Sequence, residues 1–235
     1  MIELVRNFKQ LDKNDVAIAG GKGASLGEMT KAGVPIQPGF VVLSNSFEQF
    51  IKETGINVEI ENALHSLNHK DINSVEKMSE EIRALIKLAE FPEDIKIEVL
   101  KHYKEFDAEF VAVRSSATAE DSSTASWAGE LESFLNTTVD KLLDTIKECW
   151  SSLFTPRAIF YRFEKDMQTS KVSVAVVVQK MVQSDISGIC FTVHPVTEDR
   201  DQLVIEAGYG LGEAIVGGII TPDTYIVHKD AQVKS

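Results

Sequence analysis

The chain has 235 residues, of which 43% are hydrophobic and 26% are charged, a mixture typical of a folded globular protein. Its formal net charge of −12 argues against a broad nucleic-acid-binding surface. The two cysteines, Cys149 and Cys190, are too far apart in sequence to indicate a disulfide framework or a zinc site. No apolar run approaches the roughly 18 residues that a membrane-spanning helix needs, and the first residues lack the pattern of a secretory signal. These features predict a cytoplasmic protein that binds neither nucleic acid nor membrane.

The part of the chain before residue 105 is dominated by helical patterns. Residues 40–43 predict a short strand, and Asn45 followed by Glu48 resembles a capping box that starts the next helix. Apolar residues recur at helical spacing over 74–88, and Pro92 suits the first turn of a further helix. We interpret these helices as packing elements without chemistry.

Strand-like runs follow residue 110. The predicted strands cover 110–114, 172–178, 189–193 and 203–206. The run 172–182 is almost continuously apolar, which predicts a central strand buried on both faces. Thr138 is a candidate N-cap for a helix over 139–153, and a second helix is expected from 154 to about 168. Interleaved strands and helices predict α/β or α+β layers, with a boundary between two lobes near residue 180.

The first segment that could carry chemistry is Gly20-Gly21-Lys22-Gly23. Glycines let backbone amides approach an anion closely, a helix expected to begin near Ala24 offers its positive end, and Lys22 adds a charge. The segment is not a Walker A loop, because that loop has four residues between its glycines and a Ser or Thr after the lysine. The alternative interpretation is a flexible turn with a solvated lysine.

A second segment, from Val113 to Glu130, is rich in small and hydroxyl-bearing residues. Arg114 stands at the end of a predicted strand, where its rigid guanidinium could bind a phosphate through two hydrogen bonds. The residues that follow could close over a phosphate chain and exclude water. The alternative interpretation is a serine-rich surface loop in which the arginine makes an ordinary ion pair.

The third segment comprises Gln179, Met181 and Val182, at the end of the long apolar strand. An adenine ring needs an apolar slot with backbone donor and acceptor groups along one edge, and a strand end at a junction of two lobes could supply both. The alternative interpretation is that Met181 belongs to the core.

A fourth segment contains the glycine run Gly208 to Gly212, followed by Glu213. Its Gly-x-Gly-x-Gly spacing and the lack of a long βαβ unit argue against a Rossmann site, and we expect a tight turn that faces a ligand. Pro195 beside His194 indicates a fixed turn rather than a catalytic base. Neither a catalytic triad nor a metal-ligand spacing stands out elsewhere, and no metal ligand is predicted.

Four motifs occur in an order that resembles one family. They are Gly20-Gly-Lys-Gly-Ala-Ser-Leu-Gly-Glu-Met29, Val113-Arg-Ser-Ser-Ala-Thr-Ala-Glu-Asp121, Ser152-Leu-Phe-Thr-x-Arg157-Ala and Glu206-Ala-x-x-Gly-Leu-Gly-Glu213. Together they cover nearly the whole chain and resemble the N-terminal ATP-binding domain of phosphoenolpyruvate synthase (pyruvate, water dikinase) and its dikinase relatives. The resemblance implies an α+β, ATP-grasp-like fold with the nucleotide held between two lobes.

The same resemblance implies roles for residues of this chain. Lys22 and Arg114 would be the catalytic residues that hold the ATP phosphates. The nucleotide would also contact the glycine segment, the hydroxyl-rich loop, the adenine slot and the second lobe, through Gly20, Gly21, Gly23, Ser115, Ser116, Gly129, Gln179, Met181, Val182 and Glu213. In this family ATP phosphorylates a histidine on a separate mobile domain, AMP and phosphate are released, and the phosphohistidine converts pyruvate to phosphoenolpyruvate at a third domain.

Several segments of the family have no counterpart in this sequence. The Gly-Gly-x-Thr-Ser-His segment that bears the phosphorylated histidine is absent, as are the Asp-Ile-Glu-Trp and Leu-Gln-x-Arg stretches that complete the magnesium and nucleotide site. Glu130 replaces the family's glutamine and adds negative charge near the phosphates. We therefore expect a first lobe over 1–180 and a partial second lobe over 181–235. The Mg²⁺ ligands, the phosphohistidine domain and the pyruvate/PEP domain are expected downstream or on a separate chain, so that this chain alone binds ATP weakly without turnover.

Three alternatives remain open at this point. The first keeps the ATP chemistry with another acceptor, as in pyruvate-phosphate dikinases, glucan dikinases and rifamycin phosphotransferases. The second is a non-catalytic nucleotide-binding module that pairs with a partner chain. The third is a nicotinamide-binding dehydrogenase, for which Gly208-x-Gly210 is the sole indication.

Overall fold

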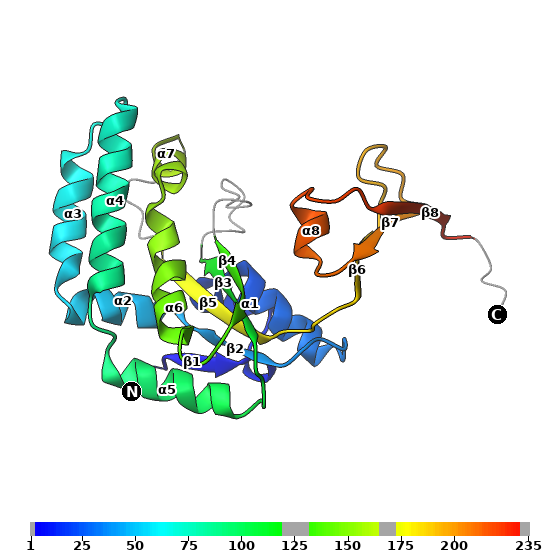
Figure 1. Cartoon of the computed structure of the whole chain (residues 1–235), viewed down its shortest axis with the longest axis horizontal. Coiled ribbons are helices and arrows are strands. Elements are labelled where there is room, and N and C mark those ends of the chain that lie inside the picture. Colours follow the sequence, from blue (N-terminus) through cyan, green and yellow to red (C-terminus); the bar gives the residue numbers. More distant parts are fainter. Residues whose placement is uncertain (1–2, 119–131, 165–172, 231–235) are drawn as a thin grey trace. The chain divides into compact units, whose positions relative to one another are not determined.

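The computed structural model describes residues 3–118, 132–164 and 173–230, and the chain divides into two compact units (Figure 1). The first unit spans Met1–Met181 and the second spans Val182–Ser235. The described strands of each unit pair in an antiparallel manner. Antiparallel sheets combined with segregated helices define the α+β class, so the predicted class is confirmed.

A five-stranded sheet forms the centre of the first unit. Its strands in spatial order are β1 (Val5–Asn7), β2 (Gly39–Val42), β5 (Val174–Lys180), β3 (Val111–Ala117) and β4 (Ser133–Thr137). β5 occupies the middle position, and its residues from Val174 to Val178 are fully buried. The continuous valine and alanine run therefore forms a central strand covered on both faces, as predicted.

Helices surround this sheet. They are α1 (Val16–Lys31), α2 (Ser44–Glu53), α3 (Ile56–Ser66), α4 (Ile72–Leu88), α5 (Glu93–Lys104), α6 (Leu142–Ser151) and α7 (Pro156–Glu164), with short 3₁₀ turns at Phe8–Gln10, Lys13–Asp15 and Ser152–Phe154. α3 and α4 run side by side at one end of the unit (Figure 1). Within the described ranges, no helix is both long enough and apolar enough to cross a lipid bilayer.

The two faces of the sheet support separate cores. Val174, Val176 and Val178 of β5 belong to the larger core, to which α2 to α6 contribute. Ala175 and Val177, on the opposite face, pack in a smaller core beneath α1. Because successive side chains of a strand point to opposite faces, β5 contributes to both cores, and Ala19 of α1 packs with Phe8 and Leu11 in the smaller one.

The predicted capping box at the start of α2 is wrong. The helix begins at Ser44, immediately after β2, and Leu43 in the N-cap position makes no side-chain hydrogen bond to the helix. Asn45 and Glu48 therefore lie inside the helix rather than at its cap. Leu43 is 1% exposed, so the packing of the strand end, and not a polar cap, determines where the helix starts.

The predicted start of the helix after β4 is also wrong. α6 begins at Leu142, with Lys141 in the N-cap position. Thr138 cannot act as the cap because it lies in the preceding turn, where its hydrogen bond to the Asp140 carboxyl lowers the pKa of that group. The following helix begins at Pro156, two residues later than expected, because a 3₁₀ turn comes first. The helix predicted over 74–88 and the one after Pro92 are confirmed as α4 and α5.

The second unit contains a three-stranded sheet in the order β6 (Ile186–Phe191), β7 (Gln202–Tyr209) and β8 (Asp223–His228), with the one-turn helix α8 (Glu213–Val216). These antiparallel pairings exclude a Rossmann βαβ unit among the described residues of this unit, as expected. His194 lies in a turn, as predicted, since its Nδ1 accepts from the amides of Val196 and Thr197 at 3.2 and 3.3 Å.

Candidate functional site

A break within α1 forms the first part of the site. Gly20 has φ 67° and ψ 171°, so the helical backbone is interrupted there and resumes at Gly21. The expectation that the helix begins near Ala24 is therefore wrong, because one glycine suffices for the turn. The amides that follow Gly20 form a new helix N-terminus, which carries the positive end of the helix dipole.

The amides of this N-terminus donate to a serine of β3. The nitrogen of Lys22 lies 3.2 Å from Ser116 Oγ, and the nitrogen of Gly23 lies 3.4 Å from the same oxygen. A Cβ atom on Gly20 would lie only 2.2 Å from that oxygen, so glycine is required for the close approach. The glycine segment and the hydroxyl-rich segment, whose bonded residues are 94 positions apart, therefore meet in one place.

Gly23 has a further packing role. A Cβ atom there would lie 3.0 Å from the Ala19 side chain and 3.1 Å from the Val41 side chain, which is tighter than an ordinary contact. Gly21 and Gly23 are both buried. The glycines of this segment therefore let the resumed helix lie close against β2 and β3.

The two faces of β3 separate neighbouring serines of the second motif. Arg114 and Ser116 share the side on which α1 packs, and Ser115 faces the opposite side. Ser115 is 1% exposed, and its hydroxyl oxygen lies 3.0 Å from both the Glu132 carbonyl oxygen and Ser152 Oγ. The Ser115 hydroxyl therefore belongs to the core, and the structure does not bring it together with the other predicted residues.

The prediction that Arg114 stands at the end of a strand is wrong, because β3 continues to pair with β5 as far as Ala117. Arg114 is the one exposed residue of β3, and its strand neighbours are buried. Since residues two apart on a strand are separated by about 7 Å, Arg114 and Ser116 lie at that spacing on one side of the sheet. None of the ion pairs within the described ranges involves Arg114. Lys22 is half-buried at the helix N-terminus. The backbones of Lys22 and Arg114 are therefore linked through Ser116, which accepts from the Lys22 amide and lies two residues after Arg114.

The end of β5 carries the first of the predicted adenine residues. Gln179 pairs with Ala112 of β3, which places it on the same side of the sheet as Arg114. Its Nε2 donates to the carbonyl oxygen of Gln37 at 3.1 Å. Gln179 is half-buried near the end of β5. Its side-chain amide is bound by the segment before β2.

Met181 and Val182 lie at the division between the units. The Met181 amide donates to the Phe110 carbonyl oxygen at 3.1 Å, and the Asn136 amide lies 2.9 Å from the Met181 sulfur. The sequence could not predict the contact between Met181 and Asn136, because the contact depends on the pairing of β4 with β3. Val182 is 52% exposed and is the first residue of the second unit.

The glycine run of the second unit forms a tight turn after β7. Gly210 has φ 85°, and its amide donates to the Asp185 carbonyl oxygen at 2.8 Å. The Ser187 hydroxyl donates to the Gly210 carbonyl oxygen at 2.7 Å. Glu213, the first residue of α8, is exposed. Glu213 thus belongs to the second unit, whereas the two predicted phosphate-binding cations belong to the first.

Part of the predicted site lies outside the described residues. Gly129 and the loop segment 119–131 fall in this range, as does Glu130. Within the described ranges, no group of three or more His, Cys, Asp or Glu side chains is arranged to hold a metal ion.

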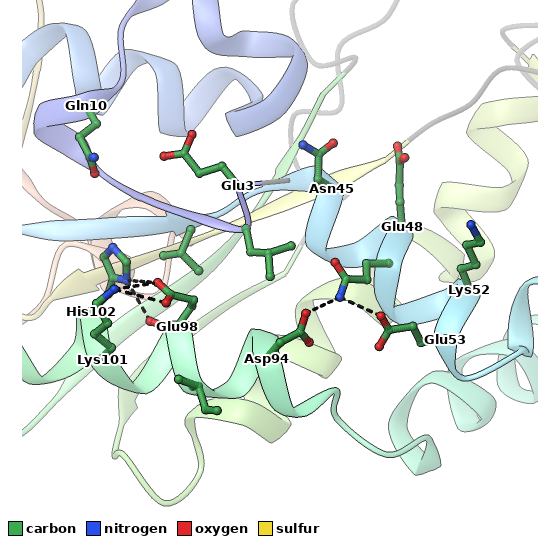
Figure 2. Close-up of a pocket in the computed structure, with 14 residues that line it drawn as sticks. Glu3, Gln10, Asn45, Glu48, Lys52, Glu53, Asp94, Glu98, Lys101 and His102 are labelled. Carbon is green, nitrogen blue, oxygen red and sulfur yellow. Dashed lines mark hydrogen bonds and ion pairs between the residues drawn. The ribbon is translucent and has the colours of Figure 1, made fainter. Parts of the chain in front are cut away.

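A groove of about 1250 Å³ lies elsewhere in the first unit, beside β1, α2 and α5 (Figure 2). Five carboxylates and two lysines line it, so its charge is negative, and Gln49 Nε2 donates to both Asp94 and Glu53 at 2.6 and 2.9 Å. ATP carries about four negative charges, so an acidic lining opposes its binding. None of the predicted site residues lines this groove, which is therefore not the candidate nucleotide site.

Residues 16–234 match the family described as pyruvate phosphate dikinase, AMP/ATP-binding domain. The chain belongs to this family. All four motifs of the sequence lie inside the matched range, and the helix N-terminus with its Ser116 contact is therefore a feature of a pyruvate phosphate dikinase AMP/ATP-binding domain.

Several named proteins are similar in sequence to nearly the whole of this chain. The probable phosphoenolpyruvate synthase of Methanothermobacter thermautotrophicus is 46% identical over 236 residues, which cover 97% of this chain and 34% of the relative. The probable phosphoenolpyruvate synthase of Archaeoglobus fulgidus is 49% identical over 92% of this chain and 29% of its own length. The rifampicin phosphotransferase of Bacillus cereus is 39% identical over 100% of this chain and 27% of its own length. The chain spans about a third or less of these relatives.

Proposed function

We propose that this chain is the ATP-binding portion of a phosphoenolpyruvate synthase-like phosphotransferase. The observation that carries the proposal is the junction between the helix N-terminus at Lys22 and β3, where Arg114 stands on the same side of the sheet as Ser116. Two cationic side chains beside the positive end of a helix dipole suit the phosphate chain of a nucleotide, although the Lys22 and Gly23 amides themselves donate to Ser116. The family description names AMP and ATP, which supports this choice of ligand.

The proposal includes an ATP-grasp-like arrangement, with a first lobe over 1–180 and a partial second lobe over 181–235. Lys22 and Arg114 would hold the phosphates, and Gln179 and Met181 would line the adenine pocket. The remaining contacts would come from residues that the motifs indicate: Gly20, Gly21, Gly23, Gly129, Val182 and Glu213. Ser115 is omitted because its hydroxyl is used within the core, and Ser116 is omitted because its hydroxyl oxygen accepts from the Lys22 and Gly23 amides.

The reaction proposed for the whole enzyme begins with phosphoryl transfer from ATP to a histidine on a separate domain. ATP, water and the histidine would yield AMP, phosphate and phosphohistidine, and the phosphohistidine would then convert pyruvate to phosphoenolpyruvate at a third domain. Both domains would lie in the longer enzyme or on a separate chain, as the greater length of the relatives suggests. Mg²⁺ would offset the phosphate charges, held by carboxylates that are not among the described residues.

A second final acceptor is favoured by one specific observation. The rifampicin phosphotransferase of Bacillus cereus is 39% identical over the whole of this chain, so the same ATP-binding domain serves enzymes with different acceptors. The acceptor would be chosen by other domains. Assaying the full-length enzyme with pyruvate and with rifampicin would separate the two possibilities, since product should form from only one.

Calorimetric titration of the full-length enzyme with Mg-ATP tests the nucleotide site, because this chain alone is expected to bind ATP weakly. Lys22→Ala and Arg114→Ala should each weaken ATP binding by roughly 10- to 150-fold, the loss of one charge-assisted hydrogen bond of about 1.5–3 kcal/mol. Lys101→Ala is the matched control, because it removes a cation from the acidic groove of Figure 2. Its ATP affinity should equal that of the unmodified enzyme.

The same titration can contradict the proposal. If neither Lys22→Ala nor Arg114→Ala weakens ATP binding, the phosphates do not lie at this junction. If Lys101→Ala alone weakens it, the acidic groove binds the nucleotide. Circular dichroism of each variant verifies that the fold is retained.

A further inference from the structure

The helix that resumes after Gly20 lacks a capping side chain of its own. Where a side chain caps a helix, the N-cap residue supplies an oxygen that accepts from the amide of the second or third helical residue. Here those residues are Lys22 and Gly23, and both amides donate to Ser116 Oγ, at 3.2 and 3.4 Å. A hydroxyl from β3 thus takes the place of the missing cap across 94 positions of sequence.

The position of this hydroxyl is tightly constrained. Ser116 is 0% exposed and pairs with Ala175 in the central strand β5. A side chain at position 20 would overlap Ser116 Oγ at 2.2 Å and the Ser116 carbonyl oxygen at 2.4 Å. Burial, sheet pairing and the close approach of Gly20 therefore fix the oxygen against the helix N-terminus.

We propose that Ser116 is a positioning residue for ATP binding, which acts by fixing the backbone of Lys22. This inference rests on the proposed function. Because Arg114 lies two residues before Ser116 on the same side of β3, the hydroxyl sets the distance between the backbones of the two phosphate-binding cations. Ser116 acts on ATP through Lys22 and has no required contact with the nucleotide.

Ser116→Ala is the variant that tests this role. It removes the acceptor from the Lys22 and Gly23 amides and frees the helix N-terminus to shift. A displacement of the Lys22 backbone would move its charge away from the phosphates. Because a misplacement of about 1 Å can cost about 100-fold, the ATP dissociation constant should rise by roughly 10- to 100-fold. Hydrogen exchange at the amides of Lys22 and Gly23 should accelerate without any nucleotide present, while exchange along β5 stays slow.

Ser46→Ala is the matched control for a general loss of stability. Ser46 is also 0% exposed, and its hydroxyl donates to the Leu4 carbonyl oxygen at 2.7 Å. It lies in α2, whose buried phenylalanines belong to the larger core, and its hydroxyl joins α2 to Leu4 rather than to the helix N-terminus at Gly20. Its removal should lower the melting temperature, while the ATP dissociation constant should stay unchanged.

A double-mutant cycle with Lys22→Ala identifies the route of the effect. If Ser116 acts through Lys22, adding Ser116→Ala to Lys22→Ala should change the ATP dissociation constant by less than about twofold. An undiminished effect in the Lys22→Ala background would overturn the inference. Unchanged ATP affinity in folded Ser116→Ala, or unchanged exchange at the two amides, would overturn it as well.

The cycle also separates failure of this inference from failure of the proposed function. If Lys22→Ala binds ATP as tightly as the unmodified enzyme, the proposed phosphate site is wrong, and the positioning role falls with it. If Lys22→Ala weakens binding and Ser116→Ala does not, the phosphate site stands and Ser116 is only a structural cap.

Discussion

Replacing Gly20 with alanine is the most direct test of the junction between α1 and β3. The substitution adds one methyl group at a position where the backbone has φ 67° and ψ 171°. That methyl would point at Ser116, whose hydroxyl caps the resumed helix. We expect the variant to lose stability through both its backbone conformation and its contact with β3.

The magnitude follows from these two effects. The backbone region of Gly20 is open almost solely to glycine, and another residue held there costs about 1–3 kcal/mol. The added Cβ would lie 2.2 Å from Ser116 Oγ and 2.4 Å from the Ser116 carbonyl oxygen, so a packed strand must move. Such overpacking costs a further 1–3 kcal/mol or so. The expected loss in the free energy of unfolding is about 2–6 kcal/mol, which is large beside the 5–15 kcal/mol of a typical domain.

Guanidinium unfolding followed by tryptophan fluorescence measures this loss. Trp150 is 0% exposed in the larger core of the first unit, so its emission reports the unit that contains Gly20. Gly55→Ala is the matched control: Gly55 has φ 75°, and a Cβ there would meet nothing within 4 Å. The control therefore carries backbone strain without a contact, and we expect a loss of about 1–2 kcal/mol.

The comparison has a clear contradicting outcome. Equal losses for Gly20→Ala and Gly55→Ala would mean that no close contact between position 20 and Ser116 exists. The hydroxyl would then not be held against the helix N-terminus, and its capping role would be wrong. A larger loss for Gly20→Ala supports the contact and leaves ATP binding to be tested separately.

Two further predictions concern the core of the first unit and the cysteines. Ile82→Ala should lower the free energy of unfolding by about 2–5 kcal/mol because Ile82 is 0% exposed. Leu88→Ala, on the same helix but 86% exposed, should change it by less than about 0.5 kcal/mol, and equal losses would contradict the described packing. Burial raises the pKa of the Cys149 thiol, whereas Cys190 is exposed, so a thiol reagent should label one cysteine in the folded chain and both after denaturation. Rapid labelling of both before denaturation would show that Cys149 is accessible.

Local sequence patterns were sufficient for the longest elements. The apolar run over 172–178 identified the central strand, and helical spacing over 74–88 identified α4, because each pattern reports burial along one element. Helix starts were harder. α2 starts at Ser44 because the buried strand end at Leu43 determines its first residue. α6 starts later than expected because the Thr138 hydroxyl is used in the preceding turn.

For the candidate site, the sequence by itself determined the residue types: a glycine segment with Lys22, and a strand that carries Arg114 followed by hydroxyl-bearing residues. It placed the end of that strand too early, since β3 continues to Ala117. The motifs of the sequence also indicated the family, and the match over residues 16–234 confirms it. The tertiary structure alone decided between the adjacent serines. Because side chains alternate across a strand, Ser115 is directed into the core and Ser116 toward α1. That choice depends on how β3 packs against a helix 94 positions earlier, and neither segment contains this information alone.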